Sequence, residues 1–248
     1  DRSVSRGLGD VYKRQDINEE LLDLLKNNKV NRISIGIQTF NDKFSKVLNR
    51  DINKKEMIEK INLTKKYFSN INIDLMYALP GESINDLKMD LEIIKKLDVT
   101  HISTYALIIE DHTNLKLQNI KETEDDIQNK MYYLILDYLK NNGYNHYELS
   151  NFAKENYESR HNLTYWNNDN YYGFGAGASG FIDNIRYDNT KSVFKYNYGK
   201  TGVYEEKLSL NELMKDEVML SLRKTNGINK DVSVSYTHLR AHETLSDL

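Results

Sequence analysis

The chain has 248 residues, of which 39% are hydrophobic, so it is long enough to bury the core of one large domain or two small ones. Its 34 Lys and Arg residues are interspersed with 37 Asp and Glu residues, and the net charge of -3 argues against a nucleic-acid partner. The longest apolar run is far shorter than a membrane-spanning helix requires. Cysteine is absent, which excludes a disulfide framework and any metal site built on thiolates of this chain.

The two ends of the chain differ in composition from the rest. Residues 1–15 (DRSVSRGLGDVYKRQ) and 233–248 (SVSYTHLRAHETLSDL) contain neither Asn nor a clear apolar period. Both resemble translated sequencing-adapter reads, so we expect them to be non-native tails. A segment without apolar periodicity has no face to dock, and we therefore predict that both tails pack on nothing.

Strand and helix patterns alternate along the first half of the chain. Short β-branched runs predict strands at residues 32–37, 71–77 and 102–109. Apolar residues at helical spacing predict helices at residues 16–29, 54–67 and 84–97. Ser83 and Asp86 form a candidate capping box for the last of these helices. The alternation predicts parallel strands joined by right-handed crossovers, which is the α/β class.

The second half of the chain has a less regular pattern. Residues 123–142 give the clearest helix pattern, with Gly143 as a C-terminal stop, and a strand pattern follows in GYNHYELS. We expect ordered loops in residues 151–180, which are aromatic and rich in glycine. A hairpin or strand at residues 181–188 and a helix at residues 210–222 complete the predicted elements.

Two glycine-containing segments have structural explanations. Pro80 and Gly81 stand where a type II turn needs them. The segment GFGAGA at residues 173–178 formally matches a dinucleotide-binding pattern, but no apolar strand leads into it and no clear helix follows. We interpret its glycines as positions where the backbone passes close to a ligand or a neighbouring strand.

Three polar residues stand at or near the ends of predicted strands. Gln38 follows the first strand, Arg50 lies in the LNRD segment after it, and Asp74 interrupts the second strand. Ligands of parallel α/β sheets bind beyond the carboxyl ends of the strands, and these side chains could together hold a nucleoside amino acid. The alternative is that Gln38 and Asp74 bind loop amides and that Arg50 is a solvated surface charge.

His161 differs from the other histidines because aromatic residues follow it in HNLTYW. An imidazole beside Tyr165 and Trp166 is the combination that binding of a planar porphyrin would use, with a nitrogen ligand for the iron and flat apolar walls. The alternative is an ordinary hydrogen-bonded histidine.

Seven motifs occur in an order that is typical of one family. They are RISIGIQTF, LNRD, NIDLMYALPGE, HISTYALIIE, GYNHYELSNFA, ESRHNLTYW and YYGFGAGASG. From about residue 16 to about residue 231 the chain resembles the HemW family of haem chaperones. This family belongs to the radical S-adenosylmethionine (radical SAM) proteins and is related to oxygen-independent coproporphyrinogen III oxidase.

The resemblance implies a fold and a division into domains. Residues 16–120 would form the last three β/α units, the C-terminal half, of a partial TIM-like (β/α)6 radical SAM barrel. Residues 121–232 would form a smaller C-terminal α+β region that carries the HNxxYW motif. Since the other half of the barrel would be missing, we expect an exposed strand edge beside residues 32–37.

The resemblance also implies cofactors. Positions matching Gln38, Arg50 and Asp74 contact S-adenosylmethionine in the family. The HNxxYW motif, which includes His161, Tyr165 and Trp166, is associated with haem binding, and His161 would be the ligand of the haem iron. The family's 4Fe-4S cluster is held by a CxxxCxxC loop that this sequence lacks, so the chain by itself is predicted to be inactive as a radical SAM enzyme. Many relatives carry histidine at the position of Ser179.

The function implied is that of a cytoplasmic haem chaperone, with haem and haem-acceptor proteins as partners and no nucleic acid. Peripheral membrane association through the acceptors and a homodimer stay open. One alternative is an oxygen-independent coproporphyrinogen III oxidase, which would act in porphyrin biosynthesis, and another is a non-functional gene fragment.

Overall fold

A computed structural model describes residues 9–12, 16–48, 53–111 and 114–229. The chain divides into two compact units, Asp1–Glu158 and Ser159–Leu248, and each is described by itself. This division falls later in the chain than the domain boundary after residue 120 that the family resemblance implies, and that boundary stays a prediction. The predicted tail at residues 233–248 lies outside the described residues.

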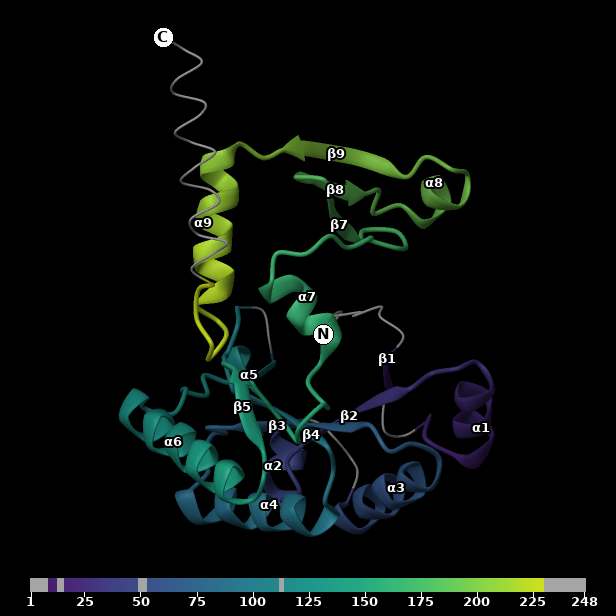
Figure 1. Cartoon of the computed structure of the whole chain (residues 1–248). Coiled ribbons are helices and arrows are strands. Elements are labelled where there is room, and N and C mark those ends of the chain that lie inside the picture. Colours follow the sequence, from purple (N-terminus) through teal and green to yellow (C-terminus); the bar gives the residue numbers. More distant parts are fainter. Residues whose placement is uncertain (1–8, 13–15, 49–52, 112–113, 230–248) are drawn as a thin grey trace. The chain divides into compact units, whose positions relative to one another are not determined.

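A six-stranded sheet organises the described part of the first unit (Figure 1). Its strands are β1 (Gly9–Tyr12), β2 (Arg32–Gln38), β3 (Ile71–Tyr77), β4 (His101–Ala106), β5 (Asn145–Glu148) and β6 (Asn151–Ala153). The order is β1-β2-β3-β4-β6-β5, with parallel pairing from β1 to β4 and antiparallel pairing of β6 with both neighbours. The predicted α/β class with parallel strands is therefore confirmed.

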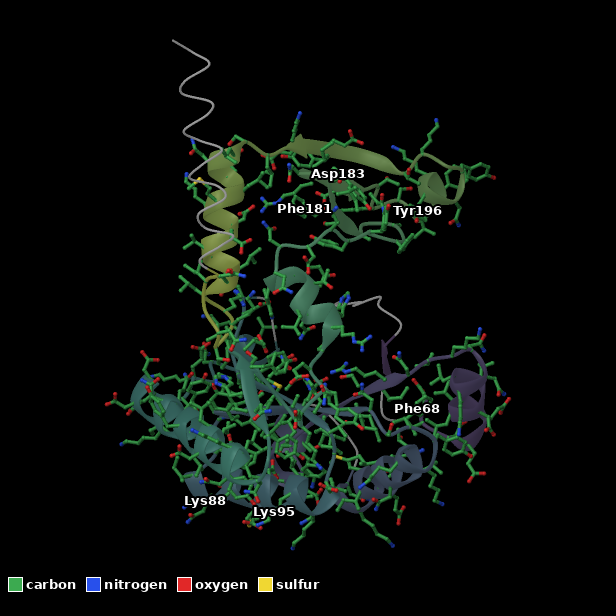
Figure 2. The ribbon with its side chains drawn as sticks, viewed as in Figure 1. Phe68, Lys88, Lys95, Phe181, Asp183 and Tyr196 are labelled. Atoms are coloured by element: carbon green, nitrogen blue, oxygen red, sulfur yellow. The ribbon has the colours of Figure 1, made fainter. Side chains whose placement is uncertain are left out.

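The larger helices of the first unit cover one face of this sheet (Figure 1). They are α1 (Glu19–Asn27), α3 (Lys54–Tyr67), α4 (Ile84–Leu97) and α6 (Asp125–Asn141). The apolar residues at alternate positions of β2 and β3 point into the core beneath them and are at most 1% exposed: Ile33, Ile35, Ile37, Ile71, Ile73 and Leu75. On α4 the solvent side carries Lys88 and Lys95, which are both exposed (Figure 2).

Several predicted elements agree closely with the structure. The helices predicted at residues 54–67 and 84–97 have the bounds of α3 and α4, and the Ser83 and Asp86 capping box is present. The strand predicted at residues 102–109 instead begins at His101 and ends at Ala106. Beyond β4, Leu107 and Ile109 are buried in a second small cluster with Phe44 and Leu79. Phe44 lies on α2 (Asp42–Val47), a short helix that the sequence analysis did not predict.

Strand β1 corrects two expectations. Its residues belong to the segment that was expected to pack on nothing, but they pair in parallel with β2 from Arg32 to Ile35. This strand also covers most of the edge that was expected to be exposed beside residues 32–37. The physical reason is that a strand edge pairs through backbone N–H and C=O groups, so apolar periodicity is not required for the pairing.

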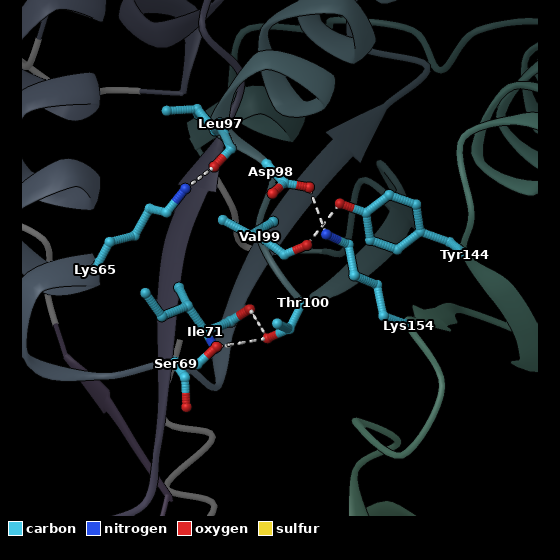
Figure 3. Close-up of polar contacts among 9 residues, drawn as sticks. All are labelled: Lys65, Ser69, Ile71, Leu97, Asp98, Val99, Thr100, Tyr144 and Lys154. Atoms are coloured by element: carbon cyan, nitrogen blue, oxygen red, sulfur yellow. Dashed lines mark hydrogen bonds and ion pairs between the residues drawn. The ribbon is translucent and has the colours of Figure 1, made fainter.

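Polar contacts join the loops at the start of β3 and β4 (Figure 3). Lys65 Nζ donates to the carbonyl of Leu97 at 2.6 Å, and the hydroxyl of Thr100 accepts from the backbone N–H of Ile71 at 2.9 Å. Tyr144 donates its hydroxyl to the carbonyl of Val99 at 2.6 Å. These bonds fix where the two strands begin, and they therefore contribute to the register of their side chains.

The described part of the second unit contains a small antiparallel sheet (Figure 1). Its elements are α7 (Arg160–Trp166), β7 (Ser179–Ile182), β8 (Ile185–Asn189), α8 (Val193–Asn197), β9 (Gly202–Lys207) and α9 (Leu210–Ser221). Phe181 on β7, which is labelled in Figure 2, belongs to a small core. The other buried members of this core are Leu208 and Leu213. The predicted hairpin and the predicted last helix are confirmed as β7–β8 and α9. Helix α7 corrects the expectation of loops throughout residues 151–180, as does strand β6.

Candidate functional site

The face of the sheet opposite the core carries polar side chains. Along β2, β3 and β4, polar residues occupy the positions between the buried apolar ones: Arg32, Ser34, Asn72, Asp74, His101 and Ser103. Because side chains alternate between the two faces of a strand, the same register that builds the core places these groups together on the opposite face. We call them the polar face.

Gln38 lies at the end of β2, beside the polar face. A β-carbon built on Gly36 would stand 3.2 Å from Gln38 Nε2, so the Gln38 side chain folds back over this glycine. Gly36 is paired with Asp74 on β3, and the side-chain amide of Gln38, which folds over Gly36, therefore lies beside the part of the polar face that contains Asp74. Gln38 has a φ of 70°, a conformation that is uncommon for residues other than glycine. Its Oε1 atom is buried and has no hydrogen-bond partner among the described residues.

Asp74 lies in the middle of β3 rather than at its end, deeper than the sequence analysis expected. Its Oδ1 accepts a hydrogen bond from Asn72 Nδ2 at 2.7 Å, and its Oδ2 is 3.5 Å from the Ser34 hydroxyl. Burial raises the pKa of the Asp74 carboxyl, while hydrogen bonds from Asn72 and Ser103 and the charge of Arg32 act in the opposite direction. The carboxyl is half-buried, with donors on one side of it.

A continuous hydrogen-bond chain leads away from Asp74. Asn72 Oδ1 lies 2.6 Å from His101 Nδ1, and His101 Nε2 lies 2.7 Å from the hydroxyl of Tyr147 on β5. His101 is fully buried, and burial, with a smaller contribution from the charge of Arg32, holds its pKa well below the ordinary value. The imidazole is therefore neutral at physiological pH.

Arg50 lies outside the described residues, so the structure brings together two of the three predicted S-adenosylmethionine contacts, Gln38 and Asp74. Asn72, His101 and Arg32 were not among the site residues predicted from the sequence. The signal that could have found them is the polar residue at every second position of the three strands.

Two buried carboxyl groups lie near the turn that follows β3. Gly81 has a φ of 75°, and the backbone N–H of Glu82 donates to the carbonyl of Leu79 at 2.9 Å, as the predicted turn requires. The Glu82 carboxylate accepts from the Leu79 N–H at 3.0 Å, and burial raises its pKa to about 8. Burial also raises the pKa of Asp90, to about 6, although its carboxylate accepts hydrogen bonds from Thr39 and Phe40.

The second candidate site lies on α7, which carries the HNxxYW segment. Ser159 caps the helix by accepting from the backbone N–H of Asn162. His161 and Tyr165 are four residues apart and share one helix face, with ring centroids 4.8 Å apart in an edge-to-face arrangement. Tyr165 in turn contacts Tyr171, with centroids 4.6 Å apart. The structure thus places His161 at the end of a row of aromatic rings.

Trp166 does not share this row. Its ring lies 4.8 Å from the guanidinium of Arg223, and its Nε1 atom is buried without a hydrogen-bond partner among the described residues. Trp166 thus lies against Arg223 in this structure, and its place in a common site with Tyr165 stays a prediction. Ser179, where many relatives have histidine, donates its hydroxyl to Asp188 on the neighbouring strand.

Within residues 9–12, 16–48, 53–111 and 114–229, no group of three or more His, Cys, Asp and Glu side chains could hold a metal ion. None of the helices described in the same ranges is long and apolar enough to cross a membrane.

Most of the parallel sheet, with its polar strand positions on β2 and β3, lies in a segment that matches a known family model. The family model of the radical SAM superfamily matches residues 10–94, a range that includes β2 and β3 and therefore both Gln38 and Asp74. Over this range the chain is similar to the radical SAM superfamily. The match begins inside the segment that was expected to be a non-native tail.

Several proteins that are similar to the chain are named haem chaperones. The chain is 41% identical over 221 residues to the protein named heme chaperone HemW of Lactococcus lactis, and 35% identical over 225 residues to that of Bacillus subtilis. These alignments cover 86% and 87% of this chain. The chain spans 58% and 59% of the length of the two relatives.

The fold is also found in a solved structure. Coproporphyrinogen III oxidase (HemN) from Escherichia coli, described as a radical SAM enzyme, superposes with a TM-score of 0.74. The match covers 87% of this chain and 54% of that one, at 18% sequence identity. This similarity confirms the partial radical SAM barrel as the fold, and at this identity it carries no information about substrate.

Proposed function

We propose that this chain is part of a haem chaperone of the radical SAM superfamily, which binds haem and delivers it to acceptor proteins in the cytoplasm. The main support is the similarity to proteins named heme chaperone HemW, at 35–41% identity over most of the chain. Haem is the cargo in this proposal, and His161 is the residue that would bind its iron.

S-adenosylmethionine fits the residues on the polar face. Gln38 Oε1 is a buried acceptor without a donor among the described residues, and a ligand amine or hydroxyl would supply one. Asp74 has a half-buried carboxyl that can accept from ribose hydroxyls. Gln38 and Asp74 would thus bind and orient the cofactor, together with Arg50. When bound beside an iron–sulfur cluster, this cofactor supplies radical chemistry to the superfamily.

The 4Fe-4S cluster does not fit this chain. Such clusters are held by thiolates, and the sequence contains no cysteine. We therefore assign no cluster ligand to any residue of this chain and derive no reaction step from the cluster.

Haem fits the chemistry of α7. A neutral imidazole is a common axial ligand of haem iron, and His161 lies at the end of the row formed with Tyr165 and Tyr171. Arg160 begins the same helix and is exposed, so it could form an ion pair with a haem propionate. Trp166, which packs against Arg223, would support the helix from its other side.

Haem titration of the chain, followed by the Soret band, tests this assignment. We expect His161→Ala to weaken haem binding and to change the Soret band, because the iron loses its axial nitrogen. His146→Ala is the matched control, since His146 stacks on Phe152 in the other unit at a centroid distance of 4.7 Å. An unchanged titration with His161→Ala would refute the ligand assignment.

The same titration separates the proposal from the alternative of a coproporphyrinogen III oxidase. Coproporphyrinogen contains no iron, so its binding needs no axial ligand. An oxidase would therefore bind the iron-free porphyrin coproporphyrin III more tightly than haem, with no dependence on His161. A haem chaperone would show the opposite preference.

A further inference from the structure

A chain of hydrogen bonds joins Tyr147, His101, Asn72 and Asp74. The contacts of the Asn72 amide indicate which group donates in each bond. We propose that His101 is a positioning residue: as the Nδ1-protonated tautomer it orients Asn72, and Asn72 in turn holds the Asp74 carboxylate in place for its ligand. The assignment of S-adenosylmethionine as that ligand rests on the proposed function. The direction of the hydrogen bonds rests on the distances around the Asn72 amide together with an ionised Asp74 and a neutral His101.

Asn72 is the residue that fixes the direction. Its Nδ2 lies 2.7 Å from Asp74 Oδ1 and 2.6 Å from the Ser34 hydroxyl, so both amide hydrogens are in use. Its Oδ1 lies 2.6 Å from His101 Nδ1, and the Ser103 hydroxyl lies 3.1 Å from the same oxygen. An ionised Asp74 can only accept, which requires the Nδ2 side of the Asn72 amide to face it.

The orientation of Asn72 then determines the tautomer of His101. An amide oxygen accepts but does not donate, so His101 Nδ1 must carry the proton. His101 is neutral, and its Nε2 then accepts a hydrogen bond from the Tyr147 hydroxyl at 2.7 Å. Donation therefore runs in one direction, from Tyr147 to His101, from His101 to Asn72, and from Asn72 to Asp74.

Hydrogen bonds that ran in the opposite direction would not hold the Asp74 carboxylate in place. If His101 carried its proton on Nε2, its Nδ1 would be an acceptor and Asn72 would have to turn its Nδ2 towards it. The Asn72 oxygen would then face the Asp74 carboxylate, and two acceptors would meet on a half-buried polar surface. That arrangement costs free energy unless Asp74 is protonated, and a protonated Asp74 binds hydroxyl donors less well.

The first test needs no variant. Long-range ¹H–¹⁵N correlation spectra of the full chain at neutral pH report which nitrogen of a neutral histidine carries the proton. We expect the Nδ1-protonated form for His101, whereas finding the Nε2-protonated form or the imidazolium would overturn the proposal.

The second test measures positioning with a matched pair of variants. His101→Asn keeps an N–H donor near the position of Nδ1, while His101→Leu has a similar size and no donor. Both lose the contact to Tyr147, so they differ mainly in the bond to Asn72. With S-adenosyl-L-homocysteine as the titrated probe, we expect His101→Leu to bind at least about fivefold more weakly than His101→Asn. Equal affinities would overturn the positioning role.

Asp74→Asn separates this inference from the proposed function. If this variant binds the probe as the wild type does, Asp74 is not a ligand contact and the proposed cofactor site is wrong. If Asp74→Asn weakens binding while His101→Leu does not, the cofactor site stands and the positioning role is refuted. Circular dichroism of each variant confirms that the fold is retained, and His146→Phe serves as a control histidine elsewhere in the same sheet.

Discussion

The Glu82 carboxyl makes the stability of the first unit depend on pH. Burial raises its pKa from 4.5 to about 8, so the folded state keeps this proton at pH values where the unfolded chain has lost it. Stability from this group is therefore complete below pH 4.5 and decreases as the pH rises towards 8. With about 1.4 kcal/mol for each pH unit, the free energy of unfolding decreases by roughly 5 kcal/mol over that range.

Glu82→Gln removes this titration. The side-chain oxygen of the introduced glutamine can still accept from the Leu79 N–H, which Glu82 binds at 3.0 Å, so the turn is retained. Urea unfolding at about pH 7, 7.5 and 8 is the assay, because the Asp90 carboxyl, with a pKa of about 6, is already ionised there. We expect the wild type to lose stability with rising pH and the variant to lose little.

The control for this experiment is Glu59→Gln, since Glu59 is exposed and pairs only loosely with Lys55 at 3.9 Å. This variant should follow the wild type at each pH. If the wild type and Glu82→Gln show the same slope across the pH range of the assay, the burial argument for Glu82 is refuted.

Three further predictions follow from the packing. Gly36→Ala should displace the Gln38 amide, which lies 3.2 Å from the added β-carbon, and should weaken binding of S-adenosyl-L-homocysteine with little change in melting temperature. Ile73→Ala, at a site with 0% exposure, should cost about 2–5 kcal/mol in urea unfolding, whereas Leu24→Ala, at 58% exposure, should cost far less. Arg223→Gln should change the fluorescence of Trp166, the single tryptophan of the chain, and unchanged emission would argue against the 4.8 Å contact.

The sequence predicted the first unit well because its helices have clear periodicity and caps. Helix α4 is the best example, since Ser83 and Asp86 determine its start and the apolar stripe determines its face. Strand β1 was missed because its pairing depends on backbone groups that are common to all sequences. Helix α7 was missed because it is only seven residues long and has no buried residue, so its pattern is too short to give a period.

The candidate site was predicted only in part. Gln38 could be recognised from its place at the end of a strand, Asp74 as a polar residue that interrupts an apolar strand, and both from the family resemblance. His101 could not, because its importance depends on three-dimensional contacts with Asn72 and Tyr147, which lie 29 and 46 residues away in the sequence. Polar alternation could indicate which face His101 occupies, but it could not indicate the partner of each nitrogen.

Gln38, at the end of β2, has two features that lower the stability of the free protein. They support a ligand site at this end of β2 rather than elsewhere on the sheet. Gln38 has a positive φ, which costs on the order of 1 kcal/mol or more for a residue other than glycine. Its Oε1 is buried without a hydrogen-bond partner among the described residues, and such a group costs about 1–3 kcal/mol. An apolar side chain at position 38 would avoid the unpaired acceptor. A ligand that donates a hydrogen bond to Gln38 Oε1 removes part of this cost only when it is bound, so the same group that destabilises the free protein would contribute to the affinity for the ligand.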